Sequence, residues 1–183
     1  MKTTLILLVL MGFLSMVQGQ VSTGTIFNLL IGTYTSPGKS EGIYIYTFNS
    51  ETGEFQYKAE AKGITNPSYM VVSDDRRNVY AVSEQGDGNG SVSAYTFDVL
   101  SGKLNLLNTV SAGGDGPCYL SVDKGKKFVF VGNYDGGSLS AIPIKADGSL
   151  SSDTQFIQHE GSSVNKSNQD KPHVHATVLS GNN

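Results

Sequence analysis

Two histidines near the end of the sequence, His173 and His175, carry the side chains best suited to acid–base or metal chemistry. They stand one residue apart in the segment KPHVHATVLS. The imidazole group changes its charge near neutral pH, so either histidine could act as a general base. A His-x-His pair can also bind Zn or Fe. The alternative is that both are ordinary strand residues, since residues i and i+2 share one face of a strand.

A metal site would need a third ligand in addition to the histidine pair. His159 or Glu160 could supply it, but their spacing from the pair matches no recognised metal-binding pattern. We therefore expect neither a metal nor another cofactor. The single cysteine, Cys118, cannot form a disulfide within the chain, and we expect a small buried residue rather than a nucleophile.

An internal repeat indicates the elements that position these residues. NPSYMVVSDDRRNVYAVSE (residues 66–84) returns as GPCYLSVDKGKKFVFVGNY (residues 116–134), so that Pro67 and Tyr69 match Pro117 and Tyr119. GSVSAYTFDVLSGKL likewise returns as GSLSAIPIKADGSL. An earlier copy, NLLIGTY followed by GIYIYTFNSETGEF, lacks the first strand. A four-strand unit that repeats every 40–50 residues or so (roughly the length of one blade) is typical of a β-propeller.

Each complete copy predicts four short strands rich in valine, tyrosine and phenylalanine. In the second copy these are Tyr69–Ser73, Asn78–Ser83, Ser91–Asp98 and Leu104–Val110. We therefore predict an all-β chain with a β-propeller fold, in preference to an all-β sandwich. PHVHATVLS would be the innermost strand of a further copy, with two extra residues that suggest a β-bulge at its start. About three and a half blades are then present, whereas a closed propeller has roughly four to eight.

Composition and charge limit the partners, and the first residues indicate a location. The 183 residues include 22 glycines and carry a formal net charge of −3, which is too small to predict nucleic acid or an anionic membrane as a partner. Residues 1–19 combine Lys2, an apolar run and small residues before an expected cleavage site near Gly19, which is typical of a secretory signal peptide. We expect a secreted or periplasmic protein without stable membrane association after cleavage.

The ordered segments LLIGTYT, NPSYMVVS, VFVGNYDGGSLSAIPI, DGSL, QHEGSSVN and KPHVHATVLS resemble the seven-bladed lactonase family. This family includes the propeller-type 6-phosphogluconolactonases and the carboxymuconate-lactonising enzymes. After the signal peptide expected at residues 1–19, the resemblance implies a partial lactonase-type propeller at residues 20–183. It also implies an intact protein with seven blades, of which this sequence is an N-terminal fragment.

Blade topology predicts which side chains share one face of the ring. The innermost strand starts at the face where the second strand ends, so these positions form one rim. That rim should gather Glu84, Asn133, Tyr134, His159, Glu160, His173 and His175. By the resemblance, the partner is a small-molecule lactone. His173 or His175 would activate water and Asn133 would stabilise the oxyanion. The other four residues would bind the substrate.

The resemblance implies an enzyme that hydrolyses 6-phosphogluconolactone or a related aldonolactone to the open-chain acid. The alternatives are a muconate-type lactonising enzyme and a non-catalytic propeller that binds or scaffolds, because a fold alone does not determine function. A secretory signal argues against a phosphorylated substrate, since sugar phosphates are scarce outside the cytoplasm. The fragment itself is expected to be poorly active or inactive, with exposed strand edges that favour aggregation.

Overall fold

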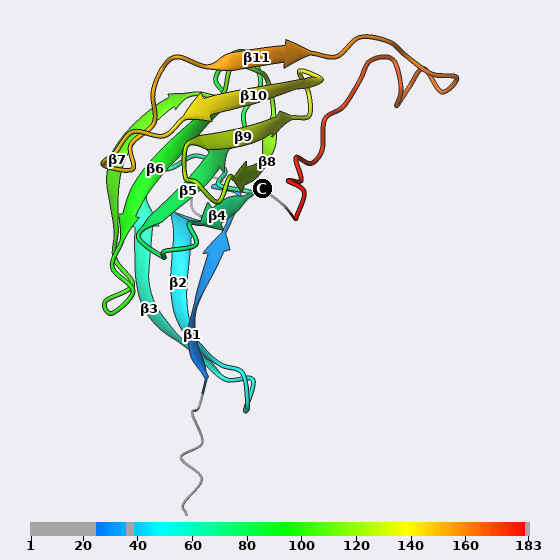
Figure 1. Ribbon diagram of the computed structural model, residues 1–183. Helices are drawn as coiled ribbons and strands as arrows, with labels where there is room; N and C mark the ends of the chain where they lie inside the picture. Colours follow the sequence, from blue (N-terminus) through cyan, green and yellow to red (C-terminus); the bar gives the residue numbers. More distant parts are fainter. Residues whose placement is uncertain (1–24, 36–38, 182–183) are drawn as a thin grey trace, which may run out of the picture.

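The structure is a computed structural model that describes residues 25–35 and 39–181. These residues form three antiparallel sheets, which follow one another in sequence order with β4 and β8 close together at their inner edges (Figure 1). Within the described ranges, no helix is long and apolar enough to cross a membrane. The predicted signal peptide, residues 1–19, lies outside the described residues.

Each sheet corresponds to one copy of the repeat. The first contains β1 (Ile26–Gly32), β2 (Gly42–Asn49) and β3 (Phe55–Lys62). The second contains β4 (Met70–Val72), β5 (Asn78–Ser83), β6 (Ser91–Phe97) and β7 (Leu104–Ser111). The third contains β8 (Pro117–Val122), β9 (Phe128–Asn133), β10 (Ser138–Pro143) and β11 (Gln155–Gln158). The predicted strands are confirmed to within one or two residues, and so is the three-stranded first copy.

The prediction of a formed strand at residues 172–180 is wrong. This segment runs beside the third blade, where the Thr177 hydroxyl donates a hydrogen bond of 3.3 Å to the carbonyl oxygen of Phe130 in β9. No described strand forms a ladder with it, and a strand is defined by the ladder to a neighbour. Because a bulge is defined against a partner strand, the predicted bulge in this segment stays a prediction. A register shift does occur in the equivalent strand β8, between Pro117 and Tyr119.

Two apolar clusters hold the three blades together, one at each interface between sheets. Strand β5 contributes to both, because successive side chains of a strand point to opposite faces. Tyr80 and Val82 pack against the third blade, whereas Val79 and Ala81 pack against the first. All four side chains are at most 1% exposed. This two-sided burial explains why the sequence of β5 is an almost continuous apolar run rather than an alternating one.

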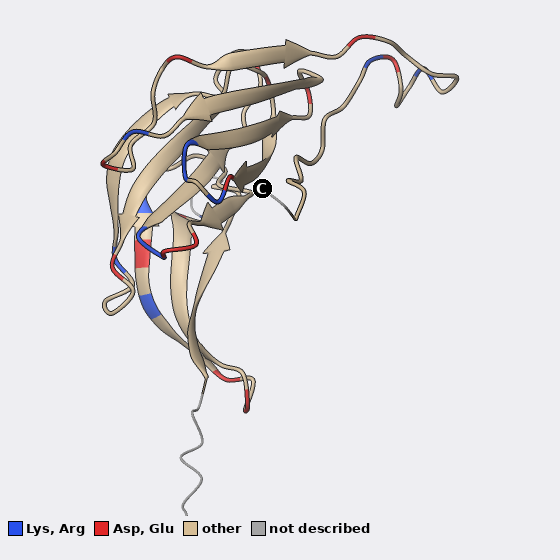
Figure 2. Ribbon diagram, in the orientation of Figure 1, with Lys and Arg blue, Asp and Glu red and all other residues tan. Residues whose placement is uncertain are grey.

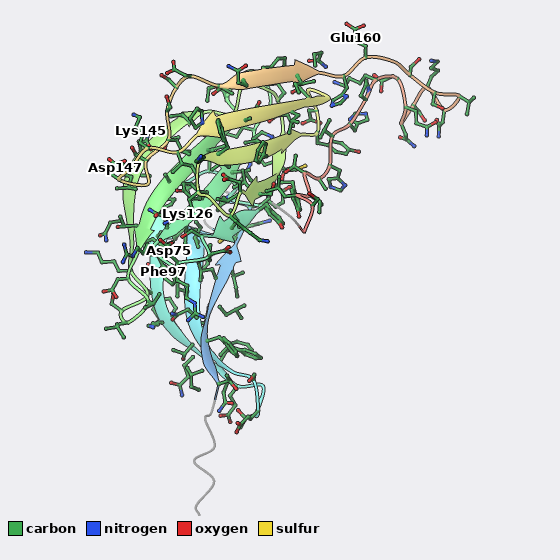
Figure 3. The ribbon with its side chains drawn as sticks, in the orientation of Figure 1. Asp75, Phe97, Lys126, Lys145, Asp147 and Glu160 are labelled. Carbon is green, nitrogen blue, oxygen red and sulfur yellow. The ribbon has the colours of Figure 1, made fainter. Side chains whose placement is uncertain are left out.

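An ion pair joins the second and third blades on the face opposite the predicted rim. Charged residues of both signs are interspersed over the molecule, many of them in the turns between strands (Figure 2). Lys126, in the β8–β9 turn, donates a hydrogen bond to the carboxylate of Asp75, in the β4–β5 turn (Figure 3). The Ser73 hydroxyl donates a second hydrogen bond, of 2.7 Å, to Asp75. These hydrogen bonds lower the pKa of the Asp75 carboxyl to about 2, and the one from Lys126 has the larger effect.

We expect Asp75→Asn to lower the free energy of unfolding by about 0.2–1 kcal/mol at neutral pH, as for other partly exposed ion pairs. Because the pKa of Asp75 is lowered in the folded state, its contribution is present above about pH 4 and is lost as pH falls toward 2. Urea unfolding of both proteins at several pH values would check this. The free energies of unfolding of the two proteins should become equal as pH falls toward 2. A difference that stays constant would contradict the lowered pKa of Asp75 as its cause.

Candidate active site

The end of the second strand of the third blade, β9, and the start of the inner segment, residues 172–180, lie together on the predicted rim. Tyr134 directly follows β9, and its ring stacks on the His173 imidazole with centroids 4.5 Å apart and an interplanar angle of 28°. The His175 ring meets the same tyrosine ring at 66°, with centroids 5.2 Å apart. Three of the predicted site residues therefore form one aromatic group at the inner edge of the third blade.

Hydrogen bonding orients the His173 ring. Nδ1 of His173 lies 3.0 Å from the carbonyl oxygen of Tyr134, which can only accept a hydrogen bond. Nδ1 therefore carries the proton, and in the neutral ring Nε2 keeps a lone pair. Nε2 lies 3.9 Å from Oδ1 of Asp170, whose carboxylate would stabilise the ring after it gains a proton. This arrangement makes Nε2 of His173 a proton acceptor with a fixed direction.

The neighbouring blades place a polar pair on the same rim. Tyr34, which follows β1 by two residues, donates a hydrogen bond of 2.9 Å to Oε2 of Glu84. This hydrogen bond is the main cause of a raised pKa of the Tyr34 hydroxyl, and burial and the charge of Glu84 add to it. The predicted substrate-binding residue Glu84 is therefore held by a phenol rather than freely solvated.

Cys118 is half-buried and lies close enough to Glu84 for that charge to act on its thiol. Its thiol points toward the carbonyl oxygen of Val174, 3.8 Å away. Burial raises the pKa of the Cys118 thiol, and the negative charges of Glu84 and Asp135 raise it further. The thiol therefore stays protonated near neutral pH, where only a thiolate would be an effective nucleophile. This agrees with the prediction that Cys118 is not the nucleophile.

Two acidic residues at the rim were missed in the sequence. Asp170 faces His173, and Asp135 lies close enough to Tyr34 and Cys118 to raise the pKa of both. The carboxylate of Asp135 packs on Gly116, where an added Cβ would lie only 2.5 Å from Oδ2. Asp135 begins an Asp-Gly-Gly run and therefore reads as an ordinary turn residue. Its place directly after Tyr134 was the available signal.

Asn133 does not belong to this group, contrary to the prediction that it stabilises an oxyanion. Its side chain is fully buried, and Nδ2 lies 3.1 Å from the hydroxyl oxygens of both Ser138 and Ser140 in β10. An added Cβ on Gly114 would lie 2.6 Å from the same nitrogen, so the amide is enclosed on that side too. Asn133 and Tyr134 are consecutive, and consecutive side chains near the end of a strand point to opposite faces. Only Tyr134 reaches the rim.

The connector after β11 forms an open hollow beside the histidines. This cavity of about 520 Å³ is lined by Tyr134, His173, Glu160 and neighbouring connector residues. Figure 3 shows Glu160 on the connector, well outside the sheets. His159 is exposed at the end of the outermost strand, where its N–H donates to the carbonyl oxygen of Gly137. The connector therefore brings Glu160 into the same hollow as His173, whereas His159 stays at the outer edge of the blade.

The described residues offer no metal centre. Nowhere in residues 25–35 or 39–181 do three or more His, Cys, Asp or Glu side chains come together in a way that could hold a metal ion. The pair of histidines instead packs around Tyr134. The site is thus built from imidazole, phenol and carboxylate groups.

Comparison with known proteins identifies the family of this chain. A family model described as lactonase, 7-bladed β-propeller, matches residues 28–183. The chain belongs to this lactonase family. It is 37% identical over 145 residues to a 6-phosphogluconolactonase of Bacillus subtilis, covering 79% of this chain and 41% of that protein. It is 32% identical over 153 residues to a 6-phosphogluconolactonase of Formosa agariphila, covering 83% of this chain and 43% of that protein.

A solved lactonase structure agrees with the arrangement of the blades. The periplasmic gluconolactonase of Pseudomonas aeruginosa superposes with a TM-score of 0.79 at 35% sequence identity. The match covers 86% of this chain and 45% of that one. The chain thus spans less than half the length of each of these lactonases. Membership of the family and the propeller fold are established by these matches.

Proposed function

We propose that the protein to which this chain belongs is an enzyme that hydrolyses a sugar lactone to the open-chain acid. The observation that carries the proposal is the orientation of His173. Its Nδ1–H is held by the carbonyl oxygen of Tyr134, so Nε2 is directed as a proton acceptor beside an open hollow. Relatives that cover most of this chain are 6-phosphogluconolactonases and a gluconolactonase, which supports the same chemistry.

The proposed reaction uses His173 as base and then as acid. Nε2 accepts a proton from a water molecule while the water oxygen attacks the lactone carbonyl carbon. The tetrahedral intermediate collapses, the bond between this carbon and the ring oxygen breaks, and the ring oxygen takes the proton from the imidazolium. The product is the hydroxy acid. Asp170 stabilises the imidazolium, and Tyr134 holds the ring in place by stacking and through its carbonyl oxygen.

We further propose a neutral aldonolactone, such as δ-gluconolactone, as the preferred substrate. Two carboxylates at the rim, Glu84 and Asp135, already act on their neighbours by raising the pKa of Tyr34 and of Cys118. The same charges would repel the phosphate group of a phosphorylated lactone. Secretion or export to the periplasm, proposed from residues 1–19, supports this choice because sugar phosphates are scarce there.

Lactone hydrolysis by the full-length gene product would test this function. δ-Gluconolactone, 6-phosphogluconolactone and a muconate-type lactone would each be followed against spontaneous hydrolysis, with a His173→Ala/His175→Ala variant as the matched control. We expect a rate above background for δ-gluconolactone that the double variant loses. Absence of any catalysed rate would favour the non-catalytic binding or scaffold protein, and activity confined to the muconate lactone would favour the lactonising enzyme.

A further inference from the structure

A second hollow opens on the rim face, between the outer parts of the second and third blades. This interblade hollow, a cavity of about 380 Å³, is lined by several glycines and by Ser111, Asp115, Ser138, Phe156 and Gln158. These residues lie at the end of β7, just before β8, at the start of β10 and on β11. Both blades that form the hollow are complete, four-stranded sheets.

The interblade hollow is separate from the hollow beside His173 but adjoins it. Among the residues that the structure describes, none lines both cavities. The turn at residues 135–137 stands between them. Gly136 lines the interblade hollow, and a Cβ added to Gly137 would lie 2.4 Å from the carbonyl oxygen of Pro172, which lines the other hollow. The two cavities are therefore neighbouring sites on one face.

Phe156 provides one flat apolar wall. Its ring is 48% exposed, and a Cβ added to Gly113 would lie 3.7 Å from Cδ2 of the ring. Phe156 therefore points from β11 toward the second blade. A single exposed aromatic ring is common on protein surfaces, but this one borders a concave site whose other side chains are polar.

The polar side chains of the hollow keep hydrogen-bonding capacity. Oδ1 of Asp115 accepts a hydrogen bond of 2.7 Å from the N–H of Gly88, which leaves Oδ2 to accept another. The hydroxyl oxygen of Ser138 accepts from Nδ2 of Asn133 at 3.1 Å, and that of Ser111 accepts from a backbone N–H at 3.1 Å. Within residues 25–35 and 39–181, neither hydroxyl has an acceptor for its own hydrogen, so both can donate to a ligand.

Gln158 is held in place by the turn that separates the two cavities. Its Nε2 donates hydrogen bonds of 2.9 Å and 3.1 Å to the carbonyl oxygens of Gly136 and Gly137. Because the amide nitrogen is fixed on the backbone, Oε1 is left as an acceptor with a defined position. The interblade hollow thus combines one aromatic ring with positioned acceptors and donors.

The corresponding place between the first and second blades lacks the ring and the carboxylate. A smaller cavity of about 210 Å³ lies there. Thr109 takes the position in the β6–β7 ladder that Phe156 takes in the β10–β11 ladder, and Thr65 matches Asp115 in the repeat. Packing of one blade on the next therefore requires neither a phenylalanine nor an aspartate at these positions. A ligand explains both residues better.

The lining also limits the kind of ligand. It contains no Lys, Arg or His, and the carboxylate of Asp115 would repel a phosphate or a carboxylate group. An entirely apolar ligand would bury the polar groups of Asp115 and Ser138 without a partner for them, which is costly. The site therefore fits a neutral molecule with one apolar face and several hydroxyl groups.

We propose that the interblade hollow binds a neutral pyranose sugar unit. A pyranose has a face of C–H groups, which can pack on an aromatic ring, and hydroxyl groups around its edge that both donate and accept. Phe156 contacts the C–H face, while Oδ2 of Asp115 and Oε1 of Gln158 accept hydrogen bonds from the sugar hydroxyls. This inference adds a sugar site beside the proposed catalytic one and does not depend on lactone hydrolysis.

Saturation-transfer difference NMR on the full-length gene product tests the proposal with the methyl glycosides of glucose, galactose and mannose. We expect at least one glycoside to bind, with the strongest transfer to the C–H protons of one ring face. Phe156→Ala should weaken this binding about tenfold or more, whereas Phe156→Tyr, which keeps the ring, should bind as the unaltered protein does. Cellobiose in a parallel titration distinguishes a single-sugar site, with equal affinity, from a site for longer saccharides, with higher affinity.

Further variants separate recognition from folding. In Asp115→Asn the amide oxygen can still accept from the N–H of Gly88, but the charge is lost, so binding should weaken about fivefold with an unchanged circular dichroism spectrum. Thr109→Ala, at the matching position of the neighbouring blade, is the control and should leave binding unchanged. An inactive protein that binds a glycoside through Phe156 would contradict the proposed lactone hydrolysis only.

Three results would overturn the proposed sugar site. The first is the absence of binding by all of the glycosides. The second is binding that Phe156→Ala leaves unchanged but His173→Ala abolishes, which would place the sugar in the other hollow. The third is binding of choline in place of the glycosides, because an aromatic ring beside a carboxylate can also hold a cation.

Discussion

Replacing His173 with alanine is expected to lower kcat/KM for lactone hydrolysis by about 10²–10⁴-fold in the full-length gene product, the usual contribution of a general base. The physical reason is the loss of Nε2, whose direction is fixed by the 3.0 Å hydrogen bond from Nδ1 to the carbonyl oxygen of Tyr134. His175 touches Tyr134 only through an edge-on ring contact and is exposed, so His175→Ala should cost less. Initial rates at several substrate concentrations would measure both effects.

His173→Asn is the matched control for this substitution. The amide N–H of asparagine can replace the hydrogen bond to the carbonyl oxygen of Tyr134, but asparagine has no basic nitrogen. If His173 is the base, both variants lose activity by a similar factor. An asparagine variant with nearly full activity would show that His173 only positions Tyr134. A larger loss for His175→Ala would transfer the role of base to that residue.

Gly32→Ala is expected to lower the stability more than a methyl group added at any other described glycine. The added Cβ would lie 1.8 Å from the carbonyl oxygen of Pro67 and 2.7 Å from Cε of Met70. The methionine can move, but the backbone oxygen belongs to the segment that joins the first and second blades. Overpacking of this kind costs about 1–3 kcal/mol and sometimes more, and we expect a value at or above the upper end.

Gly86→Ala provides the control for the glycine prediction. Gly86 lies in a loop where an added Cβ meets nothing within 4 Å, so the free energy of unfolding should change by less than about 0.5 kcal/mol. Urea unfolding monitored by circular dichroism would compare both variants with the unaltered chain. A Gly32→Ala protein as stable as Gly86→Ala would mean that the first two blades do not approach as closely as the structure shows.

The repeat made most of the fold predictable. Matches such as Tyr69 with Tyr119 locate equivalent strands without any knowledge of which strands pair. Apolar residues in β5 then indicate burial on both faces, which the two clusters on either side confirm. The local sequence could not show whether residues 172–180 form a hydrogen-bonded strand. Their pattern is that of a strand, but strand formation depends on a partner distant in the sequence or in another chain.

For the candidate site, the sequence predicted which residues share a rim better than it predicted where each side chain points. Topology placed Tyr134, His173 and Glu84 on one rim, and contacts at that rim involve all three. Asn133 was misassigned because adjacent residues at a strand end share a location but not a direction. Asp135 and Asp170 were missed because their importance comes from the groups they face, Cys118 and His173, and not from their own sequence context.

Substrate is proposed to bind at the rim that carries the Tyr134–His173 stack and the Tyr34–Glu84 hydrogen bond. A crystal structure of the full-length gene product with bound gluconate, the product of the proposed reaction, would test it most directly. We expect gluconate on this face, with its carboxylate within hydrogen-bond distance of His173 Nε2. Gluconate bound instead on the opposite face, near Asp75 and Lys126, would contradict it.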